Sequence, residues 1–475
     1  MIPLALQLNP EPFTLSHQVD MTLNPGTGKL QASDVLSVSR VPAGGVARFR
    51  FMPVLHVDRV DGAKSWQMHG NRLDVLFGAE HGALPARCTV RYHGQVPVHG
   101  GVTLLGEDWW VPSNVGAQGP CRLTLHMPSG YQGAASGDPA GASTWTFGPL
   151  HPGMALVAGR YRVYHFRRQG LPISVFLWPG DPASPDDLAD RVDAAIQYFS
   201  RTWGAYPYRK IDVLEQGQNT QADTEPSLIR MAPTVLHSRA LLDDYVPHEV
   251  SHNWWGNAVV GWSSDTLWFE PFAEFSSDLY RLDHHQEAEV RAERHATLAQ
   301  WTRTYGSKGS TAIARLVSYD GAEVEDVAYN KGCFVLSQLR DLMGDHDFRD
   351  GLRRFYATWQ GRTPTWTDIE QSFGPHLHWY FTQWLQRGDA ADLGLRDVHV
   401  AKAGLAWQVS GRVVQEGLPY RLRVPIAVDG LRFQVDTWVS SQAFHVTVPQ
   451  RPSRVALDPD EQVFRLIRSD TSVKL

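Results

Sequence analysis

Cysteine is scarce in this chain, because Cys88, Cys121 and Cys333 are the three cysteines among 475 residues. Their number is odd and they lie far apart, which argues against a disulfide framework and against a four-cysteine zinc finger. Such sparse use of cysteine is typical of proteins in a reducing compartment. We therefore expect a cytoplasmic protein.

Long apolar runs are lacking as well. The first residues, MIPLALQLNPEPF, contain no basic region and reach prolines before any apolar run of useful length. No later segment is apolar throughout over the roughly 18 residues that a membrane-spanning helix needs. Neither a membrane span nor a signal peptide is expected, and the sequence predicts no membrane partner.

The chain has no excess of basic charge. It contains 44 lysines and arginines against 50 aspartates and glutamates, well mixed, with a formal net charge of -6 at pH 7. A protein that binds a phosphate backbone needs a basic stripe or patch, which this sequence lacks. We therefore expect no nucleic-acid partner. Internal repeats and low-complexity tracts are also absent, which argues against a solenoid.

Hydrophobic patterning divides the chain into three parts. Residues 1–184 show short alternating runs such as ARCTVRYHG and CRLTLHMP between turn residues, which predicts a β-rich domain. Helical periodicity dominates residues 185–390, as in KGCFVLSQLRDLM. Alternation returns over residues 391–475 and predicts a small β-sandwich. The expected fold class is multidomain α+β, since a chain of this length exceeds one hydrophobic core.

Capping residues mark the start of two helices in the middle part. The segment WPGDPASPDD breaks the strand pattern, and Ser184 or Asp186 can cap the helix that DLADRVDAAIQYFSRTW predicts. Thr365 and Asp368 make a variant capping box at the start of TWTDIEQSF. These signals place helices near both ends of the 185–390 part.

The stretch YVPHEVSHNWWGN carries His248 and His252, four residues apart, with Glu249 beside the first histidine. On a helix, residues four apart lie on one face, so both imidazoles can bind one ion while the glutamate points toward a water on that ion. Zinc hydrolases use this arrangement. The pattern also occurs among the polar residues of ordinary helices, so the surrounding sequence has to decide.

The surrounding sequence fits a short helix. Asp243 or Asp244 can cap its start, Pro247 is tolerated in a first turn, and Gly256 can end the helix about two turns later. We therefore expect the two histidines on a helix that begins near Asp243.

A catalytic zinc also needs a third protein ligand. In DTLWFEPFAEFSSDLY the carboxylates of Glu270, Glu274 and Asp278 recur every four residues, which forms one acidic stripe if the segment is helical. A solvated helix face is the alternative. The stripe lies among aromatic residues, however, and a carboxylate in apolar surroundings is costly unless it is paired or bound to a metal. We expect a ligand among these acids.

The segments HEVSHNWWGN and LWFEPFAEF together resemble the aminopeptidase N family of zinc metallopeptidases, which read His-Glu-x-x-His-x-Trp-x-Gly-Asn and later Trp-Leu-x-Glu-Gly-Phe-Ala. The resemblance implies that Glu270 is the third ligand and that each chain binds one Zn²⁺. The family has eighteen residues between the second histidine and this glutamate, whereas seventeen separate His252 from Glu270. A deletion of one residue explains the difference. Glu274 remains the alternative ligand or an acid that supports a ligand, and Asp265 is a weaker candidate for steadying a histidine.

The same resemblance extends to the rest of the chain. VAYNKGCFVLSQLRDLMG is similar to the family's Tyr-Glu-Lys-Gly helix, which implies that Tyr329 donates a hydrogen bond to the oxyanion of the reaction. The three-part plan resembles the family's β-rich saddle, thermolysin-like catalytic domain and β-sandwich. The family's large helical fourth domain is absent from this plan.

The residue that would bind a substrate amine is less well defined. The family's Gly-x-Met-Glu-Asn strand is replaced by EQGQNTQADTEPSLIRMAP. Aligning TEPSLI with the family's Met-Glu-Asn-Trp-Gly-Leu-Ile, with one gap, gives Glu225 the amine-binding role. Aligning GQNTQ there leaves no carboxylate at all. We prefer Glu225, whose other interpretation is an exposed loop acid.

The sequence thus predicts a zinc-dependent aminopeptidase that removes N-terminal residues from peptides, with Glu249 as general base and acid. One alternative is a zinc endopeptidase or related hydrolase, if no carboxylate holds the amine. A second is a weakly active or inactive family member that acts as a binding protein. The sequence leaves the oligomeric state open.

Overall fold

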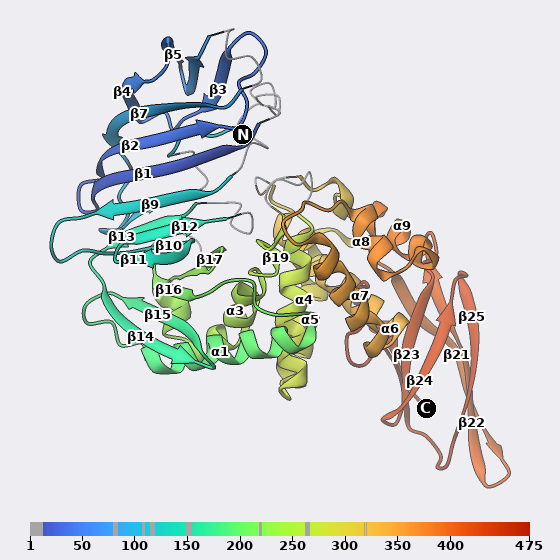
Figure 1. Ribbon diagram of the computed structural model, residues 1–475. Coiled ribbons are helices and arrows are strands. Elements are labelled where there is room, and N and C mark those ends of the chain that lie inside the picture. Colours follow the sequence, from blue (N-terminus) through green and yellow to red (C-terminus); the bar gives the residue numbers. More distant parts are fainter. Residues whose placement is uncertain are drawn as a thin grey trace. The chain divides into compact units, whose positions relative to one another are not determined.

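The computed structural model describes residues 13–78, 84–106, 110–114, 119–148, 154–217, 221–261, 267–317, 319 and 321–475. Strands come first along the chain, helices follow, and strands return at the end (Figure 1). The mixed α+β plan predicted from the sequence is therefore confirmed. The three cysteines are buried free thiols. Within the described ranges, no helix is both long and apolar enough to cross a membrane.

The chain forms two compact units, which are described separately. The first unit contains Met1–Arg201, Ala205–Trp262 and Gln360–Arg362. The second contains Thr202–Gly204, Ser263–Trp359 and Thr363–Leu475. The division into domains 1–184, 185–390 and 391–475 stays a prediction.

The N-terminal part of the first unit consists of strands, and the first two of them alternate between buried and more exposed residues, as expected when one face of a sheet covers a core. These strands are β1 (Leu15–Asn24), β2 (Lys29–Val38), β3 (Val46–Arg50), β4 (Leu55–Asp61), β5 (Ser65–His69), β6 (Arg72–Leu76), β7 (Ala86–Gln95), β8 (Thr103–Leu105), β9 (Cys121–His126), β10 (Gln132–Ala135), β11 (Asp138–Gly141), β12 (Thr144–Phe147) and β13 (Leu156–Gly159).

The largest sheet of this part has seven strands in the order β11-β12-β9-β1-β2-β7-β4. Its neighbours pair antiparallel except for β1 and β9, which run parallel. Two smaller sheets have the orders β10-β13-β8 and β3-β6-β5. Their apolar faces share one hydrophobic core with the large sheet, built around residues such as Met21, Phe49 and Tyr92.

A five-stranded sheet with the order β14-β15-β16-β18-β17 completes the first unit. Strand β15 pairs parallel with β16, although the helix α1 separates them in sequence, whereas β17 runs antiparallel to β18 at one end of the sheet. The elements are β14 (Arg162–Arg168), β15 (Leu171–Leu177), α1 (Pro185–Thr202), β16 (Ile211–Glu215), β17 (Ala222–Glu225), β18 (Leu228–Met231), α2 (Pro233–Leu236), α3 (Arg239–Ser251), β19 (Trp255–Gly256) and β20 (Val259–Val260).

The start of α1 agrees with the capping signal in the sequence. The Oγ atom of Ser184 accepts a hydrogen bond from the N–H of Asp187 at 3.3 Å, so Ser184 rather than Asp186 caps the helix.

The second unit begins with the helical part. Its helices are α4 (Phe269–Asp283), α5 (Glu287–Thr304), η3 (Gly306–Lys308), η4 (Ile313–Arg315), η5 (Glu325–Lys331), α6 (Gly332–Met343), α7 (Asp345–Trp359), α8 (Trp366–Phe373), η6 (Pro375–Leu377) and α9 (His378–Gln386). Helix α4 packs against α6, and aromatic contacts such as Phe272 on Phe355 join α4 to α7. The capping box predicted at Thr365 and Asp368 is present at the start of α8.

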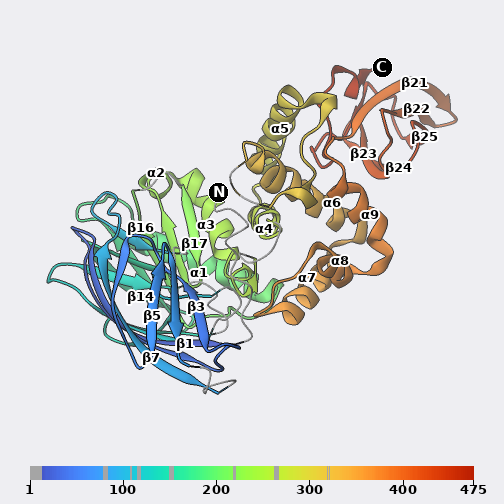
Figure 2. The same cartoon turned by 90° about the horizontal axis from the view of Figure 1, so that it is seen from above.

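The C-terminal strands of the second unit form two sheets, β21-β22-β25 and β24-β23-β26-β27. Helices α6 and α9 lie beside β23 and β24 (Figure 2), and Trp384 of α9 stacks on Tyr420 with ring centroids 4.7 Å apart. The elements are β21 (Asp392–Ala403), β22 (Ala406–Glu416), β23 (Leu422–Val428), β24 (Leu431–Thr437), β25 (Ser441–Val448), β26 (Arg454–Leu457), η7 (Ser469–Thr471) and β27 (Ser472–Lys474). The predicted C-terminal β-sandwich is confirmed.

Candidate metal centre

Helix α3 carries His248, and His252 is its C-cap residue, but the helix begins one turn earlier than predicted. Neither Asp243 nor Asp244 caps it. The side chain of Ser238 accepts a hydrogen bond from the N–H of Leu241 at 3.3 Å, and the backbone of Ser238 is extended, as is typical of an N-cap. The prediction was wrong because a proline inside the segment suggested a helix start beside it.

Pro247 lies inside α3 rather than in its first turn. Having no N–H, it leaves the carbonyl four residues earlier without a helical partner, which the tertiary packing of this buried segment tolerates. The helix also ends before Gly256, at Ser251. The Nδ2 atom of Asn253 donates to the carbonyl of Val250 at 3.0 Å and so satisfies one of the last carbonyls of the helix.

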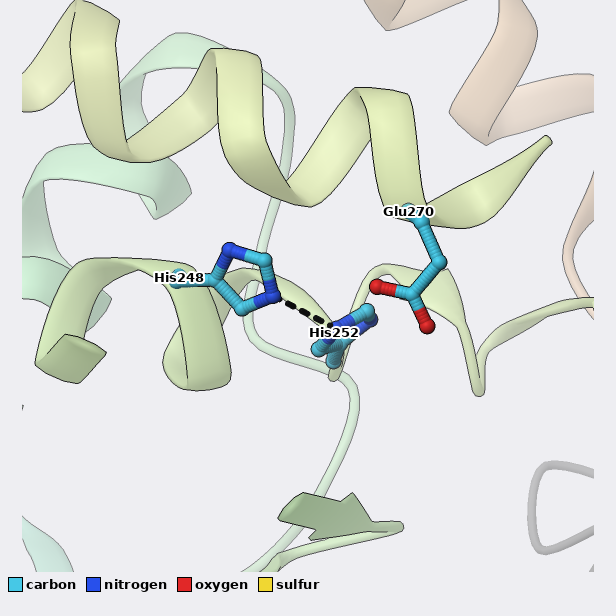
Figure 3. Close-up of side chains that lie close together, drawn as sticks. All are labelled: His248, His252 and Glu270. Atoms are coloured by element: carbon cyan, nitrogen blue, oxygen red, sulfur yellow. Dashed lines mark hydrogen bonds between the residues drawn. The ribbon is translucent and has the colours of Figure 1, made fainter. Parts of the chain in front are cut away.

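The two imidazoles face each other at the end of α3. The Nε2 atoms of His248 and His252 lie 3.2 Å apart (Figure 3), and both side chains are buried. The Nδ1 atom of His252 lies 3.0 Å from the carbonyl oxygen of Trp255. Because a carbonyl can only accept, Nδ1 carries the proton and Nε2 keeps a lone pair that can bind a metal.

Glu270, in the first turn of α4, completes the group. One ligand atom from each of His248, His252 and Glu270 lies within 4.8 Å of the other two, and all three residues are buried (Figure 3). Two imidazoles and one carboxylate are the ligand set of many catalytic zinc sites. The donor set and its spacing therefore fit a zinc ion.

The other acids of the α4 stripe differ from Glu270. Glu274 lies one turn further along α4 and does not belong to the converging group among the described residues. Asp278 is buried and pairs with Arg294 at 2.8 Å. Burial raises the pKa of Asp278, and the guanidinium of Arg294 opposes that rise. Asp265 lies outside the described residues.

Glu249 is buried, with 4% of its surface exposed. Its Oε2 atom accepts a hydrogen bond from the hydroxyl of Thr224 on β17 at 2.6 Å. Burial raises the pKa of the Glu249 carboxyl, whereas His248, His252 and the Thr224 hydroxyl lower it. The motif found Glu249 but gave no sign of Thr224, which follows from strand pairing rather than from a pattern.

Tyr319 is a second residue that the sequence did not reveal. Its hydroxyl donates a hydrogen bond to Oε1 of Glu270, and its ring lies near Phe269 with ring centroids 6.4 Å apart. The two hydrogen-bonded residues are 49 positions apart in the chain, and no motif or periodicity connects them.

Tyr329, the predicted oxyanion donor, lies half-buried on η5, a π-helical segment that continues into α6. Such segments are rare and are frequently found at functional sites. The segment is anchored by buried Lys331, whose Nζ donates to the carbonyls of Arg387 at 2.6 Å and Asp389 at 3.0 Å. The structure thus holds the backbone that carries Tyr329 firmly within the second unit.

Glu225, the predicted amine anchor, ends strand β17 and is 8% exposed, so it is not an exposed loop acid. Its Oε1 atom lies 3.7 Å from a guanidinium nitrogen of Arg230 on β18. The same guanidinium group donates to Asp223 and, at 3.1 Å, to Gln216.

The predicted site residues all lie in one segment of the chain that is similar to known proteins. Residues 218–384, which include all six predicted site residues, match the peptidase family M1 domain. A probable aminopeptidase 2 of Sulfurisphaera tokodaii is 25% identical over 197 residues, which cover 39% of this chain and 23% of that protein. Aminopeptidase N of Lactobacillus delbrueckii subsp. lactis is 27% identical over 190 residues, which cover 36% of this chain and 20% of that protein.

A leucyl aminopeptidase of Saccharolobus solfataricus is 25% identical over 197 residues, which cover 39% of this chain and 23% of that protein. The chain therefore spans about a fifth to a quarter of the length of these curated relatives.

Proposed function

We propose that this chain, whose residues 218–384 match the peptidase family M1 domain, is a zinc-dependent aminopeptidase. The observation that carries the proposal is the convergence of His248, His252 and Glu270 beside the buried carboxylate of Glu249. The names of the related proteins support peptides as the substrates. The reducing, cytoplasmic compartment expected from the sequence stays a prediction, and the oligomeric state stays open.

In this proposal His248, His252 and Glu270 hold one zinc ion. When bound, zinc would polarise the scissile carbonyl and lower the pKa of a water molecule, so that the water can lose a proton and attack the carbonyl carbon. The hydrogen bond from His252 to the Trp255 carbonyl fixes the tautomer and the orientation of that ring. The hydroxyl of Tyr319 likewise fixes the orientation of the Glu270 carboxylate.

Glu249 is proposed as general base and then general acid. It accepts a proton from the attacking water and returns the proton to the leaving amine as the peptide bond breaks. Its burial beside two imidazoles supports this role, because a carboxylate shielded from bulk water keeps its proton for the reacting groups. The hydroxyl of Tyr329 is proposed to donate a hydrogen bond to the oxyanion of the tetrahedral intermediate.

Glu225 is proposed to bind the protonated amine of the substrate. Glu225 ends β17, is 8% exposed and lies 3.7 Å from a guanidinium nitrogen of Arg230, so a carboxylate is held at this place by the strand. A charged amine that leaves water needs such a partner, and an acetylated terminus brings no charge to offset the desolvation of the carboxylate. A carboxylate that pairs with the substrate amine favours exopeptidase over endopeptidase activity.

The test compares one peptide with a free and with an acetylated N-terminus. We expect kcat/KM to be at least about 100-fold higher for the free peptide, as for the loss of one buried charged contact. Glu225→Gln should raise KM for an aminoacyl anilide much more than it lowers kcat. Asp223→Asn is the matched control, because it also removes a carboxylate from Arg230 and should change KM less.

Equal kcat/KM values for the two peptides would favour the second candidate, a zinc endopeptidase. One observation favours that reading: Arg230 already gives Glu225 a cationic neighbour within the chain. Equal effects of Glu225→Gln and Asp223→Asn would likewise return Glu225 to a structural role.

A further inference from the structure

Strand β17 presents different chemistry on its two faces. Successive side chains of a strand point to opposite faces. Asp223 and Glu225 both contact Arg230 on the neighbouring strand β18. Thr224, between them, points to the other face, where β17 packs against α3. The strand thus brings a hydroxyl to the helix that carries the histidine motif.

The Thr224 hydroxyl meets Glu249 at two points. Its Oγ1 atom lies 2.6 Å from Oε2 of the Glu249 carboxylate and 3.1 Å from the Glu249 carbonyl oxygen. A hydroxyl has one proton, and the shorter of the two distances identifies the carboxyl group of Glu249 as its partner. Thr224 is 2% exposed and Glu249 is 4% exposed, so water competes little for this bond.

The donor is held more rigidly than the acceptor. A threonine side chain is branched at Cβ and has a single heavy-atom torsion, and the backbone of Thr224 is fixed by pairing with Ile229 on β18. A glutamate side chain has three torsions, of which the last is broad. The hydrogen bond therefore fixes the position of the Glu249 carboxylate relative to the end of α3.

We propose that Thr224 is a positioning residue that orients the general base Glu249, so that one carboxylate oxygen is held by the strand and the other faces the attacking water. The inference rests on the proposed function of Glu249. In the family alignment that aligns TEPSLI with Met-Glu-Asn-Trp-Gly-Leu-Ile, Thr224 takes the place of the methionine. A thioether cannot donate a hydrogen bond, so this chain differs from the family pattern at the residue that contacts its base.

The kinetic test uses two variants of Thr224. Thr224→Val keeps the shape of the side chain and removes the hydroxyl, whereas Thr224→Ser keeps the hydroxyl. With an aminoacyl anilide, we expect Thr224→Val to lower kcat by about 10- to 100-fold with little change in KM, as for a misplaced catalytic group. Thr224→Ser should restore most of the lost kcat. Zinc content should be equal in all three proteins.

Two kinetic outcomes would overturn the proposal: a Thr224→Val variant with unchanged kcat, or a Thr224→Ser variant impaired as much as Thr224→Val. The second would mean that Thr224 acts through packing.

A structural test does not depend on activity. Crystal structures of the zinc-loaded wild-type and Thr224→Val proteins should show the Glu249 carboxylate displaced or in several conformations in the variant. A carboxylate in the same place in both structures would refute the positioning role. A wild-type protein without activity on any peptide would instead refute the proposed function, and the crystal structures would still decide on Thr224.

Discussion

Glu249 and Glu215 are both buried acids of the first unit, and burial is the largest factor that raises the pKa of each. Their neighbours differ. Glu249 lies between two imidazole residues on α3 and accepts the Thr224 hydroxyl. Glu215 ends β16, accepts the N–H of Trp178 at 2.6 Å and lies near the carboxylate of Asp181, which raises its pKa further. Burial alone therefore does not identify a catalytic acid.

The difference lies in what surrounds each acid. Within the ranges that the structure describes, the ligand atoms that converge as a metal-binding group belong to His248, His252 and Glu270, and both histidines lower the pKa of Glu249. Around Glu215, His237 bonds to Asp181 at 2.8 Å, and Asp181 also hydrogen-bonds to Glu215. A perturbed acid beside a group of metal-ligand side chains is a candidate for catalysis, whereas one hydrogen-bonded to a second carboxyl group is a candidate for pH-dependent stability.

The largest expected effect tests whether the surroundings of Glu249 hold a metal. The purified protein should contain about one equivalent of zinc, and His252→Ala should lose the metal and with it all turnover. Glu270→Ala should lose metal to a far greater extent than Glu274→Ala, the matched control one turn along the same helix. Elemental analysis of proteins purified without added metal measures this. Greater loss from Glu274→Ala would exchange the two roles.

The next effect concerns Glu249 itself. Glu249→Gln should keep the metal but lower kcat by about 10³-fold or more, because the amide has a similar size and cannot accept the proton of the water. Metal analysis and steady-state kinetics on the same preparation separate the two properties. A variant that turns over at more than a tenth of the wild-type rate would show that another group is the base.

The metal motif could be predicted from the sequence because its geometry is local. The spacing of His248 and His252 fixes their common face on any helix. The capping box of α8 was likewise readable from Thr365 and Asp368. The start of α3 could not be predicted in this way, because its cap, Ser238, lies well before the histidine motif and Pro247 suggested a later start.

Contacts between distant parts of the chain could not be predicted. The hydrogen bond from Tyr319 to Glu270 joins residues 49 positions apart, and the bond from Thr224 to Glu249 depends on which face of β17 meets α3. The pairing of β15 with β16 across α1 is equally non-local. Such contacts arise from strand order and tertiary packing, which hydrophobic periodicity does not encode.

A smaller effect is expected at Tyr329. Tyr329→Phe should lower kcat by about 10²- to 10³-fold with little change in KM, as expected for a hydrogen bond made only in the transition state. Tyr319→Phe is the comparison variant for the role of Tyr329, because the Tyr319 hydroxyl contacts Glu270. Its removal should weaken zinc binding more than it lowers kcat of the zinc-saturated protein. Full kcat in Tyr329→Phe would leave its hydroxyl without a catalytic role.

The smallest effect on activity is expected from Glu215→Gln. This variant is also the most direct test of the contrast between Glu215 and Glu249. The pKa of Glu215 is raised from 4.5 to about 7, first by burial and then by Asp181, while the Trp178 N–H and His237 lower it. A carboxyl with a raised folded-state pKa contributes stability that is complete below the unfolded pKa and is lost as the pH rises through the folded pKa. The contribution of Glu215 to stability should therefore be lost between about pH 4.5 and pH 7. Glutamine cannot ionise and can still accept the Trp178 N–H, so the variant should unfold at the same temperature as the wild type near pH 4.5 and at a higher temperature at pH 8. The difference corresponds to at most about 3 kcal/mol.

Thermal unfolding at the two pH values measures this difference in stability, and kcat/KM should stay unchanged. A variant that is no more stable than the wild type at pH 8, or that loses activity, would remove the distinction drawn between Glu215 and Glu249.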